Sequence, residues 1–220
     1  MRRATVWAGL PVVALALTGC SVGETRQDVA YGVDQPVRVL VVEGSTGDIE
    51  VVGGGDAVSV TERQEYRGAA PQTRHRVEDG TLTLSYSCGD CSVDYRVRVP
   101  EGTVVRLSSS TGDVRVSGLA GAVDAQTGTG SVEASGLGPA SVRLESGTGD
   151  VVASFRAAPR EVTASSSTGD VRVVVPGGQP YAVDADSGAG DVRVDLARSA
   201  GAERRISART GAGDVTVSGA

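Results

Sequence analysis

Apolar and polar residues alternate in short runs along most of the chain, and glycine-rich segments separate the runs. One run alternates Val105, Leu107 and Ser109 with outward residues, turns at Gly112 and alternates again from Val114. Alternation with a period of two predicts β-strands that bury one face. Glycine allows the backbone angles that a tight arc between two strands requires. The pattern therefore predicts an all-β protein made of strand–arc–strand units.

The strand–arc–strand unit recurs at nearly constant intervals in residues 104–220. The last glycine of each arc returns after 18, 19, 20, 21 and 23 residues, at Gly112, Gly130, Gly149, Gly169, Gly190 and Gly213. An earlier copy lies apart at Gly44–Val51. A period near 20 residues is typical of solenoids, in which each copy is one coil stacked on its neighbour. We therefore predict a single-stranded β-solenoid (β-helix) of about six to seven coils.

Stacking the copies in chain order places equivalent residues above one another. One buried column would contain Val114, Val132, Val151, Val171, Val192 and Val215. A ladder of hydroxyls, each bonding the next, would contain Ser109, Thr127, Ser146, Ser166, Ser187 and Thr210. Outward neighbours of opposite charge would be Arg115 with Glu133, and Asp124 with Arg106 and Arg143, whereas Arg172 and Arg193 would be neighbours of like charge.

An antiparallel meander, with each glycine-rich segment as a hairpin loop, is the alternative architecture. Only every second connection keeps the phase of the repeat, which favours the solenoid. Residues 36–103 repeat less regularly, and we expect a first coil followed by an irregular β-rich cap, because a solenoid must cover its open end. Residues 20–35 are assigned to a tether.

Few aromatic side chains are available to fill a core. Aromatics make up 3% of the chain, hydrophobic residues 40%, and glycine accounts for 31 positions. Since large rings normally fill the wide centre of a core, we expect a thin core of Val, Ala and Leu.

The first residues are typical of an export signal. Arg2 and Arg3 precede an apolar stretch, Val6–Leu17, that is too short to span a bilayer. The following Leu17-Thr18-Gly19-Cys20 resembles the bacterial lipobox. The resemblance implies removal of residues 1–19, lipidation of Cys20 and an extracytoplasmic protein anchored to the cell membrane. The alternative is an ordinary secretory peptide with an unmodified cysteine.

Charge argues against nucleic acid as a partner. The formal net charge is −6, and loss of Arg2 and Arg3 makes the remainder −8. An acidic domain repels polyanions. The expected partners are the membrane, through the lipid on Cys20, and an envelope polymer or surface protein.

Two further cysteines, Cys88 and Cys91, flank a Gly-Asp pair. Outside the cytoplasm such a pair most often forms a disulfide. A redox motif would open a helix, whereas this segment lies between predicted strands. We expect a structural disulfide; metal binding, a redox role and free thiols are the alternatives.

An aspartate follows most arc glycines and supplies the strongest candidate for a binding function. The column contains Asp113, Asp150, Asp170, Asp191 and Asp214, and is interrupted at Ser131. Calcium would relieve repulsion between stacked carboxylates. Calcium-binding β-rolls, however, have a nine-residue period and separate Gly from Asp. We therefore expect these carboxylates to accept backbone hydrogen bonds, with a calcium-binding surface β-roll as the alternative.

No catalytic constellation is evident. The one histidine, His75, lies between Arg74 and Arg76, where a solvated surface role is expected, and the serines form a ladder instead of adjoining a histidine and a carboxylate. The repeats also lack the aromatic platforms of polysaccharide-active β-helix enzymes. We predict no enzyme activity and no cofactor, with such an enzyme as an alternative.

The repeats and the step Val97-Arg98-Val99-Pro100-Glu101-Gly102 that leads into them support a family resemblance. Residues 36–219 resemble bacterial β-strand-repeat proteins of unknown function that carry the label “putative adhesin”. The resemblance implies a β-solenoid and a non-catalytic, adhesin-like or scaffold role at the cell surface. A sensory lipoprotein for envelope stress is a further alternative.

Overall fold

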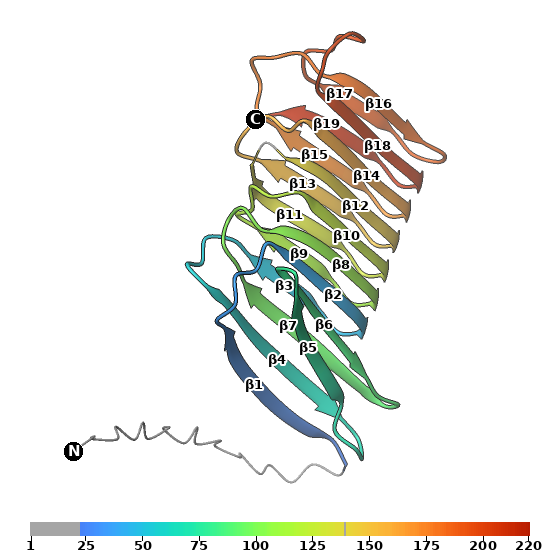
Figure 1. The fold of residues 1–220 in the computed structure, drawn as a ribbon. Coiled ribbons are helices and arrows are strands. Elements are labelled where there is room, and N and C mark those ends of the chain that lie inside the picture. Colours follow the sequence, from blue (N-terminus) through green and yellow to red (C-terminus); the bar gives the residue numbers. More distant parts are fainter. Residues whose placement is uncertain (1–22, 139) are drawn as a thin grey trace, which may run out of the picture.

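Two β-sheets lie face to face along one axis in the computed structural model, which describes residues 23–138 and 140–220 (Figure 1). In spatial order, the ten-stranded sheet contains β1 (Thr25–Val33), β4 (Val58–Tyr66), β7 (Cys91–Arg98), β3 (Ile49–Val52), β9 (Val114–Ser117), β11 (Val132–Leu137), β13 (Val151–Phe155), β15 (Val171–Val175), β19 (Val215–Gly219) and β17 (Val192–Asp195). The nine-stranded sheet contains β16 (Ala182–Ser187), β18 (Arg205–Ala212), β14 (Glu161–Thr168), β12 (Ser141–Thr148), β10 (Val123–Thr129), β8 (Val104–Thr111), β2 (Val39–Thr46), β6 (Thr81–Ser87) and β5 (Gln72–Glu78). The described ranges hold no helix suited to crossing a bilayer.

Each repeat contributes one strand to each sheet, and neighbouring repeats run in parallel. Strand β10 pairs with β8 and β12 so that Val123 lies beside Val105 and Val142. In the other sheet, Val132 lies between Val114 and Val151 and is 0% exposed. Parallel pairing confirms the predicted stack of repeats and excludes the meander for this region.

The interior is thin and filled by aliphatic side chains, as expected from the shortage of aromatics. One column alternates large and small residues, Leu107, Ala125, Leu144 and Ala164, all buried. Such alternation lets neighbouring layers interdigitate. The outward charge pattern is also confirmed, since Asp124 lies between Arg106 and Arg143, and Glu133 lies beside Arg115.

The last two repeats are interchanged relative to chain order, which corrects our prediction. Strands β18 and β19 pair with β14 and β15, and β16 and β17 lie outside them at the end of the stack. In the valine column Val215 therefore lies between Val171 and Val192, and Val192 is 46% exposed.

Two physical reasons favour this order. It places Thr216 between Arg172 and Arg193, which removes the predicted contact between like charges. It also sets Arg205 beside Glu161 and buries Ile206 on both sides, whereas the smaller Val183 occupies the partly open end.

The N-terminal region joins the stack more closely than the predicted irregular cap. Strands β6 and β7 pair in parallel with β2 and β3, in the same way as the repeats. The cap proper consists of β4 and β1 on one sheet and β5 on the other, each paired antiparallel. Residues 25–33, assigned above to the tether, form β1, because their alternation of Val29, Tyr31 and Val33 faces the interior.

The cap contains a buried polar cluster. The carboxylate of Glu62, 1% exposed, accepts hydrogen bonds from the Tyr31 hydroxyl at 2.7 Å and from Gln64 Nε2 at 2.9 Å. Burial first, and then Glu62, raises the pKa of both Tyr31 and Tyr95 well above the usual tyrosine value. Both phenols therefore stay protonated, and Tyr31 serves as a fixed donor to Glu62.

Glycine in the arcs is required by backbone angle and by space. Gly130 has φ +135°, and a Cβ built on it would lie 2.2 Å from the carbonyl oxygen of Gly112 in the neighbouring repeat. Its own N–H donates to Thr148 O at 2.8 Å. The arcs thus stack at a distance that admits no side chain at this position.

We expect Gly130→Ala to lower the free energy of unfolding by about 3 kcal/mol, because it combines positive-φ strain with a backbone clash. Urea denaturation followed by circular dichroism measures this loss. Gly102→Ala is the matched control, since a Cβ at Gly102 would have no atom within 4 Å. Equal stability of the two variants would contradict close stacking of the arcs.

Candidate functional site: arc ladders and the polar sheet face

A row of hydroxyls, buried except for the half-buried Ser187, runs beside the arcs at the predicted positions, but its partners differ from those we expected. Ser146 Oγ donates to Gly130 O at 2.8 Å, and Thr210 Oγ1 donates to Gly169 O at 2.7 Å. Thr127, Ser166 and Ser187 bond the equivalent carbonyls, and Ser109 makes a longer contact at 3.4 Å. Each hydroxyl therefore satisfies a glycine carbonyl of the adjacent arc instead of the next hydroxyl.

The aspartates form a second ladder on the outer side of the arcs. Oδ1 of Asp170 accepts the N–H of Asp214 at 2.8 Å, and Oδ1 of Asp214 accepts the N–H of Asp191 at 2.9 Å. The same bond links Asp150 to Asp170 and Asp113 to Ser131. The ladder continues into the N-terminal repeats through Asp94, Asp48 and Asp113.

These bonds give the carboxylates a structural role between repeats. Asp113 also pairs with Arg115, whose guanidinium lies 3.3 Å from Asp48. Partial burial would lower the pKa of Arg115, but Asp113, Asp48 and Glu133 together raise it. In residues 23–138 and 140–220, no three His, Cys, Asp or Glu side chains gather as a metal site would require.

The outer face of the nine-stranded sheet carries a polar groove across β8, β10, β12 and β14. The groove has a volume of about 440 Å³ and is lined on its outer side by Ser108, Gln126, Glu145 and Ser165. These residues are register neighbours on successive strands. Gly128 and Gly147 lie beside them in the lining and have no side chains to fill it. The result is a hydroxyl- and amide-lined furrow that runs along the stack.

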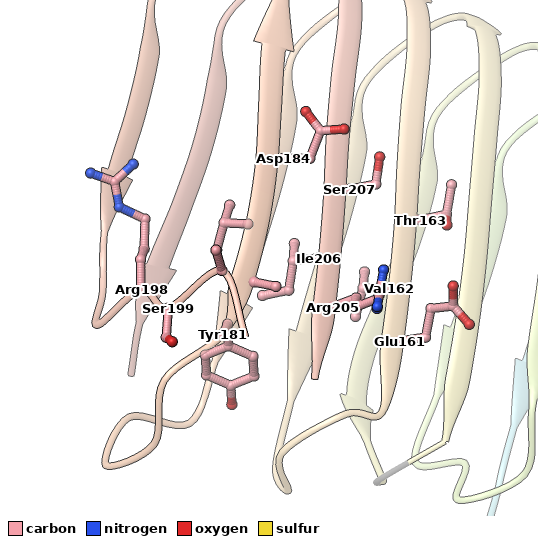
Figure 2. A pocket seen from close by; sticks show the side chains of 13 residues that line it. Glu161, Val162, Thr163, Tyr181, Asp184, Arg198, Ser199, Arg205, Ile206 and Ser207 are labelled. Atoms are coloured by element: carbon pink, nitrogen blue, oxygen red, sulfur yellow. The ribbon is translucent and has the colours of Figure 1, made fainter. Parts of the chain in front are cut away.

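A second hollow, of about 480 Å³, lies at the end of the same sheet, where β14, β18 and β16 begin (Figure 2). Its charged lining residues are Glu161, Asp184, Arg198 and Arg205. Asp184 is engaged by Arg209. This hollow could not be predicted from the sequence, because it depends on the interchanged order of the last repeats.

The remaining predicted sites lie apart from the groove. Cys88 and Cys91 form a disulfide in the β6–β7 connection, with Cα atoms 6.0 Å apart. His75 is an exposed residue of β5 whose ring packs 4.7 Å from that of Tyr31. Cys20 lies outside the described residues. The described structure therefore brings neither His75 nor the cysteine pair together with the aspartate ladder.

A structural role and a calcium-binding role of the aspartates predict different results for two variants of Asp170. Asp170→Asn keeps an oxygen that can accept the Asp214 N–H and should have the same free energy of unfolding as the wild type. Asp170→Ala loses this acceptor and should lower the free energy of unfolding by about 1 kcal/mol. Melting in excess calcium and in chelator completes the test. A rise in melting temperature with calcium that both variants abolish would favour the calcium site instead.

Comparisons with known proteins agree with this architecture. A solved structure described as a putative cell adhesion protein from Clostridium sporogenes matches with a TM-score of 0.58 and 14% identity, covering 89% of this chain and 100% of that one. A putative adhesin from Bacteroides fragilis matches with a TM-score of 0.52 and 18% identity, covering 91% and 98%. At these identities the likeness concerns the fold. No functionally curated protein has significant sequence similarity to the chain. A family model described as Toastrack DUF4097 matches residues 29–218, and the chain therefore belongs to this family.

Proposed function

We propose that this protein is a non-catalytic binding module of the cell surface, anchored through a lipid on Cys20, that contacts an envelope polymer through the outer face of its nine-stranded sheet. The observation that carries the proposal is the groove across β8–β14, lined by Ser108, Gln126, Glu145 and Ser165. The descriptions of the two fold relatives, a putative cell adhesion protein and a putative adhesin, are in keeping with a binding role.

The chemistry of the groove suits an uncharged, hydroxyl- or amide-rich chain. Its lining repeats at the spacing of β-strands, about 4.8 Å, so that a polymer running along the stack meets a hydrogen-bonding group at each step. The one carboxylate, Glu145, is paired with Arg143. The groove therefore contains no unpaired carboxylate among its described lining residues, although the chain has a net negative charge.

The proposed anchor would place one end of the stack at the membrane. Strand β1 begins at Thr25, five residues after Cys20, at the end of the stack opposite β16 and β17 (Figure 1). Five extended residues reach at most about 18 Å. A ten-stranded stack at about 4.8 Å per strand is about 45 Å long, so the far end can stand well clear of the lipid.

The anchor is tested by Cys20→Ser in cells. We expect the wild type in the membrane fraction, carrying a metabolically incorporated fatty-acid probe, and the variant in the soluble extracytoplasmic fraction without the probe. Immunoblotting of the fractions measures both. Membrane retention of the variant at wild-type levels would count against the lipid anchor.

The groove is tested by filling it. Ser165→Trp places a large ring in the groove and should weaken co-sedimentation of the purified protein with isolated cell-wall polymer at least about tenfold in apparent Kd. Ser154→Trp, at a comparably half-buried outward position of β13 on the other sheet, should bind like the wild type. Equal binding by both variants, or no sedimentation of the wild type, would remove the groove from the proposed function.

A further inference from the structure

The end of the stack leaves a strand edge open. Strand β16 is the last of its sheet and pairs with β18 on one side only. The N–H groups of Ala182 and Gly188 donate toward β18, to Arg204 and Thr210. Because successive residues of a strand direct their backbone groups to opposite sides, Val183, Ala185 and Ser187 direct theirs away from the stack. These groups can pair with an added strand.

Side chains along this edge specify what an added strand would carry. Asp184 and Asp186 point outward and are exposed, whereas Val183 and Ala185 are half-buried and face the interior. Arg209 pairs with Asp184, and among the described residues no guanidinium or imidazole pairs with Asp186. An added strand would therefore place basic side chains beside the aspartates and small apolar ones toward the interior.

One end of the edge is closed by a short segment that carries Arg198. Ser199 N donates to Tyr181 O at 3.0 Å, and Tyr181 N donates to Ala197 O at 3.1 Å. Figure 2 shows Arg198 and Ser199 on the side of Tyr181 away from Ser207. An added strand must end here, beside the hollow that Arg198 and Arg205 line. Neither guanidinium has a carboxylate within salt-bridge distance in the described part of the chain.

We infer that the edge of β16 binds the C-terminal segment of a partner protein. The segment adds as an antiparallel strand, with basic and small apolar residues in alternation, and its terminal carboxylate binds at Arg198. Antiparallel pairing follows from the geometry, because only that direction brings the C-terminus to the beginning of β16. Strand addition supplies backbone hydrogen bonds, and capture of the carboxylate fixes the register. This site is separate from the groove and does not depend on the proposed polymer contact.

The test is fluorescence polarisation with the full chain purified in detergent and a labelled peptide of sequence Gly-Lys-Val-Lys-Val. We expect saturable binding of the free acid, and binding of the C-terminal amide at least about tenfold weaker. Arg198→Ala should make the two peptides bind equally. Asp186→Asn should weaken both while keeping the preference for the acid. Arg172→Ala, on the outer face of the other sheet, is the matched control and should change neither.

Blocking the backbone edge separates strand addition from charge attraction. Ala185→Pro removes only an N–H that points away from the stack and should abolish binding with the melting temperature kept. If that variant unfolds, a peptide N-methylated at its central residue replaces it, and loss of binding is expected. Equal binding of acid and amide to the wild type, full binding after either block, or no saturation by about 1 mM peptide would overturn the inference. A wild-type dimer that Ala185→Pro makes monomeric would instead identify a second copy as the occupant.

Discussion

The close contact between successive arcs is the constraint on which the rest of the structure depends. At each arc that has a further repeat stacked on it, a glycine N–H bonds the adjacent repeat and its carbonyl accepts a side-chain hydroxyl, as Gly130 does with Thr148 and Ser146. Aspartate carboxylates add a third bond between repeats. Since both sheets leave from the same arc, its register fixes the register of both. A slip by one residue would turn every buried valine toward solvent.

The shortness of each arc also determines how the interior is filled. Two residues separate β8 from β9, and so short an arc keeps the two sheets close together. Alternating Leu and Ala in one column, with valines opposite, suffice for the volume between the sheets. Larger buried side chains occur where the repeats end, as at Phe155 and Tyr181 beside connectors and Tyr95 near the cap. Because the interior is regular, the outer faces of the sheets are regular as well. In the polar groove, Gly128 and Gly147 leave a gap in the row of outward side chains.

Most of the fold follows from the repeat, because each Gly-Asp-Val step marks an arc and sets the phase of its strands. The order of the last two repeats could not be read in this way, since their arcs, Gly188–Val194 and Gly211–Val217, are nearly identical in sequence. Only differences outside the arc, such as Arg205 beside Glu161, separate the two orders. The end hollow and the edge of β16 depend on that order and were equally hidden.

The parallel pairing of β6 and β7 with the stack was not predicted, for a different reason. Strands β6 and β7 join the stack without an arc glycine. Val93 stands at the position of that glycine, with its carbonyl against Gly47, and Asp94 occupies the aspartate position. The phase of Asp94 before the alternation of Tyr95, Val97 and Val99 was the available signal. The groove was not predicted, although the register that aligns its residues was.

The interchanged repeats bear on the order in which the chain completes its fold. Strands β16 and β17 emerge before β18 and β19, yet they rest on them. A chain that folds from its N-terminus onward can therefore stack its repeats progressively. Strands β16 and β17, however, cannot pair with the stack until residues 205–220 have formed β18 and β19. Residues 176–204 therefore form an insertion between two repeats that are neighbours in space. This insertion can vary in length and sequence without a change in the repeats on which it packs.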